Sequence, residues 1–482
     1  MRLFNYLEGI EFYTNGKLSL DKEIMGVTSR SSSIKEGYIF VCIDGLHTDG
    51  HIFACEAKRR GAALLVVERI TDCVIKSGLP FIKTDNTRKA LSLMCAKHVG
   101  NPERELKLIA VTGTNGKTST CSILTEIYRK AGINACSLGT LDGGLTTPDP
   151  EELFLLLRRM FDSGITTVVM EASSHALAFD KLYGVNFKGG IFTNLTPEHL
   201  DFHKDMDEYA KCKSKLFSNC AYGLYNSDDG YVEAVKRNNK GRAYTYSVGG
   251  NADFIASNVR YLGVDGFEYD LLTAKVTIKI KSRLSGGFNV YNTLAAASAA
   301  YIDGISTEDI EKGIGSIDGV KGRLERLDVE GSDISVYIDY AHTPDALEKV
   351  LMCIRSFKSR DQKLTLVFGC GGDRDRSKRK VMGRIASSLA DLVVVTADNS
   401  RSENTSDIIN EILKGIDKER AYKVIEDRET AIAYAIEQCE KNGIVLLCGK
   451  GHENYEIGRF GKRYFSEREI AVKAVNKRVQ KE

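Results

Sequence analysis

The 482-residue chain contains no tryptophan and only six prolines, and no apolar stretch approaches the roughly 20 residues that span a bilayer. The first residues include Glu8 and Glu11 and no apolar run of signal-peptide length. An excess of one charge sign is also missing, because 67 basic residues stand against 65 acidic ones. Nothing in this balance indicates a nucleic-acid or anionic-membrane partner. We therefore expect a cytoplasmic monomer that acts on small molecules.

Paired cysteines are absent as well. The chain has twelve cysteines but no C-x-x-C pair, and most lie inside apolar runs such as "LTLVFGC" and "IVLLCGK". Disulfide scaffolds and zinc sites need paired cysteines, so buried, reduced thiols are the better interpretation.

Short apolar runs that end in glycine or a polar loop recur along the chain: "LIAVTG", "TTVVMEAS", "GGIFTNLT", "VYIDYAH", "LTLVFGCGG", "LVVVTADNS" and "IVLLCGKG". Runs of this length without alternation are typical of parallel strands buried on both faces. Helix-length segments such as "STCSILTEIYRKAG" and "DALEKVLMCIRSF" lie between them. The pattern predicts an α/β fold whose ligand groups gather at the carboxyl ends of the strands. We divide the chain into three blocks, residues 1–105, 106–322 and 323–482, because it is too long for one core.

The stretch "AVTGTNGKTST" predicts a phosphate-binding loop of unusual length. The standard loop has four residues between its first glycine and the Gly-Lys pair, whereas only two residues separate Gly113 from Gly116. The loop follows a strand and precedes an amphipathic helix, so backbone N–H groups and the helix N-terminus would face a phosphate. Lys117 would reach the terminal phosphates, and the Thr118 hydroxyl would ligate Mg²⁺. The alternative is a glycine turn whose lysine merely caps a helix.

An acid and a histidine follow two further strands of the second block. Glu171 comes after "ITTVVM" and His199 after "GGIFTNL", so both should project from the same sheet edge as the loop. A carboxylate, an imidazole and phosphate oxygens would form a Mg²⁺ shell. Five of the eight histidines lie in loops of this kind, and a structural role for any one of them stays open: His175, His199, His203, His342 and His452.

The motifs "GTNGKT", "EASSHAL", "FTNLTPEHLDFH", "GGFNVYNTLAA", "GRLERL", "DYAHTPDAL", "FGCGGDRD" and "CGKGHE" occur in the order found in Mur ligases. The chain resembles this family from about residue 25 to 460. These enzymes use ATP to add amino acids to the UDP-linked peptidoglycan precursor, and they carry the short "GTNGKT" loop. The chain is most similar to the tripeptide synthetases, the third enzymes of the series, which extend UDP-N-acetylmuramoyl-L-alanyl-D-glutamate.

The resemblance implies a three-domain Mur ligase architecture for the three blocks. The first would bind the UDP-sugar. The second would bind ATP on a parallel or mixed sheet like that of P-loop ATPases, and the third, Rossmann-like, would bind the amino acid. The reaction it implies activates a carboxylate as an acyl phosphate, which the incoming amine attacks to form an amide. Such a path needs charge neutralisation more than a strong base.

The resemblance also implies a role for individual residues. The ATP site would contain Gly113, Thr114, Asn115, Gly116, Lys117, Thr118, Ser119, Asn289, Asn292, Arg323, Asp339 and His342. Catalysis would depend on Lys117, Glu171, His199, Lys213, Arg323 and Asp339. Two Mg²⁺ ions would be held by Thr118, Glu171, His199 and Lys213. The UDP-muramoyl-dipeptide would contact Ser29, His47, Thr48, Thr146, Thr147 and Ser173. The amino acid, meso-diaminopimelate, would contact Arg374, Asp398, Asn399, Arg401, Gly449 and Glu453.

Lys213 is the least obvious of these residues. The family carries a carbamylated lysine in the pattern Y-x-x-x-K-x-x-L-F, so the resemblance implies a CO₂-derived carbamate on Lys213. Lys211 and Lys215 flank it, and the residues alone would favour a solvated basic helix face.

The chain departs from the family pattern at three positions. Phe179 and Lys181 replace a glutamine and an arginine expected near the sugar-peptide site. In "ADNSRSE", Ser400 replaces the proline of Asp-Asn-Pro-Arg, but Arg401 is kept. An arginine there can pair with the far carboxylate of diaminopimelate, which lysine lacks, so diaminopimelate is favoured. The alternatives are an L-lysine-adding synthetase, a folylpolyglutamate synthase-like ligase and a nucleotide-binding regulatory module.

Overall fold

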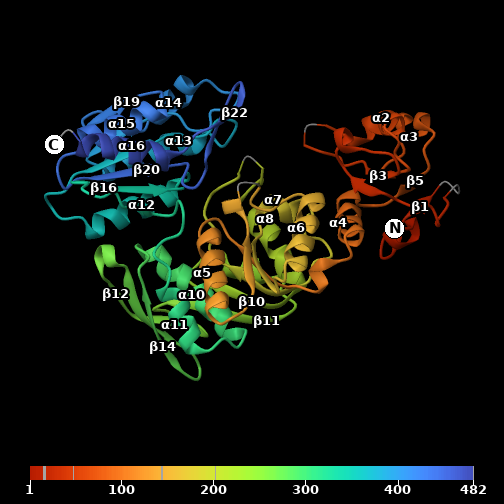
Figure 1. The fold of residues 1–482 in the computed structure, drawn as a ribbon, viewed down its shortest axis with the longest axis horizontal. Helices are drawn as coiled ribbons and strands as arrows, with labels where there is room; N and C mark the ends of the chain where they lie inside the picture. The colour runs from red at the N-terminus through yellow and green to blue at the C-terminus, as the bar shows by residue number, and fades with distance from the viewer. Residues whose placement is uncertain (15–17, 47, 143–144, 201, 481–482) are drawn as a thin grey trace.

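The structure, a computed structural model, describes residues 1–14, 18–46, 48–142, 145–200 and 202–480. Among these residues the strands form three large sheets and one hairpin. Figure 1 shows three blocks built on these sheets, with the first block and the third block on either side of the second. Each described strand and helix falls within one block, although the boundaries at 105/106 and 322/323 stay predictions.

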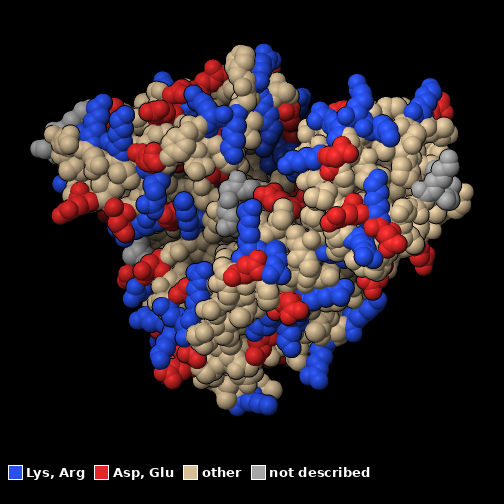
Figure 2. Space-filling view, turned by 45° about the vertical axis from the view of Figure 1, so that its right-hand side comes forward, with Lys and Arg blue, Asp and Glu red and all other residues tan. Residues whose placement is uncertain are grey.

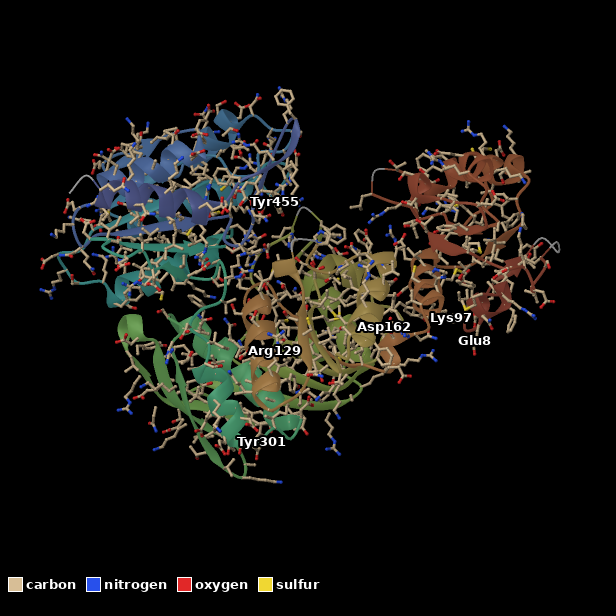
Figure 3. The ribbon with its side chains drawn as sticks, viewed as in Figure 1. Glu8, Lys97, Arg129, Asp162, Tyr301 and Tyr455 are labelled. Carbon is tan, nitrogen blue, oxygen red and sulfur yellow. The ribbon has the colours of Figure 1, made fainter. Side chains whose placement is uncertain are left out.

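The first block is built on a five-stranded sheet in the order β1-β5-β4-β3-β2, with β1 antiparallel to β5 and the other pairs parallel. Its strands are β1 (Tyr13–Thr14), β2 (Gly26–Thr28), β3 (Tyr38–Val41), β4 (Leu64–Val67) and β5 (Phe81–Lys83). Its helices are α1 (Leu3–Leu7), α2 (Ala54–Arg59), α3 (Asp72–Ser77) and α4 (Thr87–His98). The Lys97 ammonium near the end of α4 donates to the backbone carbonyl of Glu8, and the two residues lie side by side in Figure 3. This bond fastens the end of α1 to α4.

The second block is built on a nine-stranded sheet in the order β14-β13-β12-β11-β10-β9-β6-β8-β7. Its strands are β6 (Lys107–Thr112), β7 (Ala135–Leu138), β8 (Thr167–Glu171), β9 (Phe187–Phe192), β10 (Cys220–Asn226), β11 (Arg242–Val248), β12 (Phe254–Tyr261), β13 (Phe267–Leu272) and β14 (Thr277–Ser282). Its helices are α5 (Lys117–Lys130), α6 (Pro150–Asp162), α7 (Ser174–Ala178), α8 (Met206–Ser214), α9 (Val232–Lys236), α10 (Gly287–Ile302) and α11 (Thr307–Gly315). The sheet is mixed: β6 to β12 run parallel to one another, while β13 and β14 form an antiparallel edge.

The third block is built on a six-stranded sheet in the order β15-β16-β20-β17-β18-β19, in which only β15 is antiparallel to its neighbour. Its strands are β15 (Glu325–Leu327), β16 (Ser335–Asp339), β17 (Leu364–Phe368), β18 (Leu392–Val395), β19 (Tyr422–Val424), β20 (Ile444–Cys448) and the antiparallel hairpin β21 (Tyr455–Gly458) and β22 (Gly461–Tyr464). Its helices are α12 (Pro344–Phe357), α13 (Ser377–Leu389), α14 (Thr405–Leu413), α15 (Arg428–Gln438) and α16 (Glu467–Val479).

The predicted α/β fold is confirmed at each of the seven apolar runs, which form β6, β8, β9, β16, β17, β18 and β20. These strands are buried along nearly their whole length because helices cover both faces of their sheets. Two separate apolar clusters lie on opposite sides of β6: Ile109 and Val111 belong to one cluster, Leu108 and Ala110 to the other. Alternate residues of one strand therefore feed two cores.

The first and second blocks share one of these cores. Met94 of α4 belongs to the same buried cluster as Leu153 and Leu157 of α6, and the two helices pack together. Apolar packing of this kind holds the first block against the second.

Charges of both signs lie intermixed on the face shown in Figure 2, in keeping with the near-neutral composition. In the part of the chain that the structure describes, no helix combines the length and the apolar composition needed to cross a membrane.

Candidate active site

A cavity of about 1040 Å³ lies between the second and third blocks, at the carboxyl ends of strands from both sheets. Its wall brings together most of the predicted ATP-site, metal-site and amino-acid-site residues, together with one residue of the predicted UDP-muramoyl-dipeptide site, Thr146. These are Thr114, Asn115, Gly116, Lys117, Thr118, Ser119, Thr146, Glu171, His199, Asn292, Arg323, Asp339, His342, Arg374, Asp398, Asn399, Arg401, Gly449 and Glu453. Residues more than 300 positions apart in the sequence thus face one space.

Other predicted residues are not part of this wall. Asn289 and Lys213 lie buried behind it, as does Thr147, and Gly113 and Ser173 also contribute nothing to it. The two predicted first-block residues that the structure describes, Ser29 and Thr48, lie outside the strands of the first block and do not line this cavity, and His47 lies outside the described residues.

The short phosphate loop fits because two glycines are packed too closely to carry side chains. Gly113 has φ +149° and Gly116 has φ +84°. A Cβ on Gly113 would lie 1.9 Å from the Thr193 hydroxyl, and one on Gly116 would lie 2.4 Å from the side-chain oxygen of Asn292. The loop is therefore pressed between the end of β9 and helix α10, with no room for a side chain at either glycine.

Two lysine amines meet beneath this loop. Lys117 Nζ donates to the carbonyl oxygens of Gly113 (2.9 Å) and Thr114 (2.8 Å). Lys213 Nζ donates to the same Gly113 oxygen at 2.9 Å and lies 4.5 Å from the centre of the Tyr209 ring. The Lys213 side chain is buried, and desolvation together with the charge of Lys117 holds its pKa well below the ordinary value.

A chain of hydrogen bonds connects the third block to the carboxylate at the end of β8. Arg323 Nη2 donates to the Thr118 hydroxyl at 2.9 Å, and that hydroxyl donates to Glu171 Oε1 at 3.0 Å. The backbone N–H of Thr140 donates to the same Glu171 oxygen at 2.9 Å. Glu171 is buried and receives these bonds from neutral donors, so its charge is left for a cation to balance.

Asp339 holds the turn that carries Arg323. One carboxylate oxygen accepts the N–H of Leu324 (2.6 Å) and the other accepts the N–H of Ala341 (2.7 Å). Burial raises the pKa of Asp339, against the lowering effect of the Arg323 charge. The Arg323 guanidinium lies 4.6 Å from the centre of the Tyr340 ring. These contacts point Arg323 across the block junction toward Thr118.

Glu198 is a cavity residue that the motif analysis missed. Its Oε1 accepts a hydrogen bond of 3.0 Å from His342 Nε2, and this bond joins the second block to the third. Burial opposes ionisation, but the bond from His342 and the neighbouring His199 and Lys117 together lower the pKa of Glu198. His342 Nδ1 lies 2.9 Å from the Tyr340 carbonyl oxygen. The available signal was position, because Glu198 directly precedes His199 in the same strand-end loop.

His199 faces the cavity from a left-handed backbone position, with φ +57°. Its ring stands edge-on to His175 at 4.9 Å between centres, and His175 in turn stacks on Phe202 at 4.2 Å. Desolvation lowers the pKa of His199 to about 4, so the ring is neutral at neutral pH. Three of the five strand-end histidines, His175, His199 and His203, are thus gathered in one aromatic cluster.

At the other end of the cavity lie Arg374 and Arg401. Arg401 Nη1 donates to the carbonyls of Gly372 (2.8 Å) and Asn399 (3.2 Å). Burial and the charge of Arg374 lower the pKa of Arg401. Two guanidinium groups that repel one another at the wall of a cavity form a site for an anion.

Asn399, a predicted ligand contact on the cavity wall, also bonds to its protein neighbours. Its Oδ1 accepts from Lys450 Nζ (3.0 Å) and the Ile457 N–H (2.8 Å), while its Nδ2 donates to Glu453 Oε2 at 2.9 Å. Tyr455 OH lies 3.4 Å from the other Glu453 oxygen, at the edge of the third block that faces the second (Figure 3). The Asn399 amide therefore orients Glu453, and these three bonds leave the second N–H of its Nδ2 unused. Lys450, which donates to the Asn399 side chain, is fully buried.

The first block meets the second through the start of α6. The N–H and hydroxyl of Ser29 both donate to Glu151 Oε1, at 2.9 and 2.8 Å. Arg30 and Lys181 each lie 2.7 Å from one oxygen of Asp149. The lysine that departs from the family pattern is thus part of an ion-pair cluster at this junction. Phe179, the other departure, lies under the guanidinium of Arg88 at 4.5 Å.

Three family models match the chain in sequence order: "Mur ligase family, catalytic domain" over residues 23–98, "Mur ligase middle domain" over 111–300 and "Mur ligase, glutamate ligase domain" over 322–451. UDP-N-acetylmuramoyl-L-alanyl-D-glutamate–2,6-diaminopimelate ligase of Clostridioides difficile (strain 630) is 40% identical over 491 residues, covering 99% of this chain and 100% of its own. The ligase of the same name from Clostridium botulinum is 39% identical over 460 residues, covering 93% and 94%. A solved structure of a ligase with this name has a TM-score of 0.69 and 28% identity, and covers 99% of each chain. The chain belongs to the Mur ligase family.

Proposed function

We propose that the chain uses ATP to join meso-2,6-diaminopimelate to the D-glutamyl carboxylate of UDP-N-acetylmuramoyl-L-alanyl-D-glutamate. The relatives from Clostridioides difficile and Clostridium botulinum are named as ligases that act on these two substrates. The product would be an amide in a peptidoglycan precursor, formed through an acyl phosphate with release of ADP and phosphate.

One observation carries the proposal: a single cavity is lined both by a phosphate loop from the second block and by a pair of arginines from the third. Lys117 and Thr118 belong to the loop, and Arg374 and Arg401 are the arginines. A ligase of this type must bring a nucleotide phosphate, an acceptor carboxylate and an incoming amine together. The arrangement places an amino acid with a second carboxylate within the same space as ATP.

At the phosphate end the chain supplies positive charge and hydrogen-bond donors. The Lys117 ammonium is bonded to two carbonyls of the loop, and it would exchange these partners for phosphate oxygens. The N-terminus of α5 adds its partial positive charge directly behind the loop. Arg323 reaches the same place from the third block. These groups would stabilise the charge that develops during phosphoryl transfer.

The family implies Mg²⁺, and the donors near Glu171 fit it. The described residues include no group of three His, Cys, Asp or Glu side chains set to hold a metal, but Mg²⁺ usually takes only one or two carboxylates together with phosphate and water. Glu171 is buried and accepts from the neutral donors Thr118 and Thr140, and the Thr118 hydroxyl and the neutral His199 ring lie on the same wall. These residues would hold the ion, which would neutralise phosphate charge when bound.

Lys213 suits the carbamate that the family implies. Its amine is buried with a carbonyl as its hydrogen-bond partner, and an uncharged amine is the form that reacts with CO₂. A carbamate there would place an anion beside Lys117 and would add an oxygen ligand for a second ion. Lys211 and Lys215 are exposed, which separates them from Lys213 as candidates.

Phosphate release by the purified protein tests the proposal. Release should require ATP, UDP-N-acetylmuramoyl-L-alanyl-D-glutamate and meso-diaminopimelate together, and omission of any one should abolish it. Phosphate release that does not depend on the UDP-linked substrate would overturn the ligase assignment for this chain. Release with L-lysine but not with meso-diaminopimelate, in the presence of the other two substrates, would overturn the choice of amino acid.

A further inference from the structure

Arg379, which belongs to none of the predicted sites, is a fully buried arginine beside the amino-acid end of the cavity. Its side chain is 0% exposed and comes from the first turn of α13. Nη1 and Nη2 donate to the two oxygens of Glu403 at 3.0 and 2.9 Å, a bidentate pair. Nη1 also donates to Glu411 (2.8 Å), and Nη2 donates to the Gly371 carbonyl (3.0 Å). The Arg379 guanidinium thus bonds to the turn after β17, through Gly371, and to the turn after β18, through Glu403.

Glu403 carries this grip further. Its Oε1 accepts the backbone N–H of Asp373 at 2.6 Å, and Asp373 has a left-handed backbone with φ +51°. The hydrogen bonds from Arg379 are the largest cause that lowers the pKa of Glu403 to about 2, so the carboxylate stays ionised. The turn before Arg374 is therefore held in an unfavourable conformation by a buried ion pair.

Further bonds join this turn to the one that carries Arg401. The Gly372 N–H donates to the Asn399 carbonyl at 2.9 Å. The Ser402 hydroxyl donates to Asp373 Oδ1 (2.6 Å), and the Ser402 N–H donates to Asp373 Oδ2 (3.1 Å). Arg374 follows Asp373 directly and Arg401 precedes Ser402 directly. Any slip between the two turns would change the separation of the two guanidinium groups.

We propose that the Arg379–Glu403 pair is a positioning element that sets the spacing of Arg374 and Arg401, and so determines the preference for an amino acid with a second carboxylate. The inference rests on the proposed function, because it gives those two arginines their ligand. Arg379 is too deeply buried to touch that ligand. It acts through the turns, as buried groups behind a site commonly do.

The chain offers a matched control in Arg376. Its guanidinium contacts the same two carboxylates, Glu403 at 2.8 Å and Glu411 at 3.8 Å. It is 63% exposed, whereas Arg379 is fully buried and also donates directly to the Gly371 backbone carbonyl. An exposed ion pair contributes little, so a role that depends on holding the turns should belong to Arg379 alone.

The test compares Arg379→Lys, Glu403→Gln and Arg376→Gln with the native enzyme, with thermal melting as the check on folding. We expect Arg379→Lys and Glu403→Gln to raise the KM for meso-diaminopimelate by about tenfold or more, the loss typical of a buried charged hydrogen bond. The KM for ATP should stay within about twofold, and the preference for diaminopimelate over L-lysine should shrink. Arg376→Gln should leave all these values near native.

The result that would overturn the inference is a fall in kcat with unchanged KM and unchanged amino-acid preference, because a merely structural role gives that pattern. An equal effect from Arg376→Gln would also overturn it. If Arg379→Lys fails to fold, Glu403→Gln decides, since it keeps the size of the side chain. If the native enzyme uses another amino acid, the proposed function fails, and the positioning role is judged by whether the KM of that amino acid rises without that of ATP.

Discussion

Replacing Arg401 with alanine should weaken the use of diaminopimelate far more than the use of ATP. A charge-assisted pair between an arginine and a carboxylate contributes about 1.5–3 kcal/mol, which corresponds to about 10- to 150-fold in KM. The backbone adds nothing to this difference, because Arg401 has φ +51° and alanine, which also carries a Cβ, experiences the same strain.

The structure places the expected effect in the upper part of that range. Arg401 Nη1 also donates to the carbonyls of Gly372 and Asn399, so alanine removes one bond to the turn of Arg374 and one within the turn of Arg401 itself. Both arginines of the predicted carboxylate site would then be affected by a single change. We expect a rise of about 50- to 150-fold in the KM for diaminopimelate.

Steady-state phosphate release with each substrate varied in turn measures this effect. Arg401→Lys should lose less than Arg401→Ala, because it keeps the charge but not the planar fork. Arg376→Ala, an exposed arginine nearby, is the control and should resemble the native enzyme. A change of less than threefold in the KM for diaminopimelate, or an equal rise in the KM for ATP, would refute the pairing of Arg401 with the far carboxylate.

Three other perturbations test separate parts of the site. Lys117→Ala should lower turnover by about 100-fold or more in the phosphate-release assay without changing the melting temperature, since the loop loses its ammonium; a variant that keeps a tenth of native turnover would contradict this. Lys213→Ala should be nearly inactive and partly restored by added formate or acetate, while Lys211→Ala should be near native because Lys211 is exposed; the reverse ranking would show that the wrong lysine was chosen. For Glu403, whose pKa falls from 4.5 to about 2 in the folded chain, stability should be fully present above pH 4.5 and be lost as the pH falls toward 2. Melting temperatures measured across this range should fall less steeply for Glu403→Gln, and parallel curves would show that Glu403 makes no such contribution.

The strands that could be predicted from the sequence are those buried on both faces. A continuous apolar run such as "LTLVF" has one interpretation in a strand-helix alternation, and it forms β17. Strands β11 to β14 were not recognised, because their exposed faces break up the apolar runs. In β14 the buried residues Ile278 and Ile280 alternate with exposed Lys279 and Lys281, and this alternation was the available signal.

Within the site, residues that touch a ligand were easier to find than residues that hold them. The loop of Lys117 can be recognised from its glycine spacing. The role of Glu198 rests on its hydrogen bond with His342, which lies 144 positions away in the sequence. Lys450 and Arg379 likewise act through partners that only the fold brings near. Sequence spacing carries no record of such long-range pairs, so their roles appear only in three dimensions.

The same limit applies to the predictions for Asn399 and Lys213, whose surroundings only the fold shows. Asn399 stands in a ligand motif, and only the fold shows that its amide also orients Glu453, while its direct contact with the amino acid stays a prediction. Lys213 cannot be told from Lys211 by charge pattern, since both lie on one helix. Burial separates them, because the Lys213 side chain points beneath the phosphate loop and Lys211 is exposed.

An equimolar competition between meso-diaminopimelate and L-lysine tests the proposed reaction most directly. The purified protein is supplied with ATP and UDP-N-acetylmuramoyl-L-alanyl-D-glutamate, and the products are resolved by mass. The predicted result is a UDP-linked tripeptide that contains diaminopimelate, with one ADP and one phosphate released for each amide formed. A lysine-containing tripeptide as the main product, or ADP formed without any tripeptide, would contradict it.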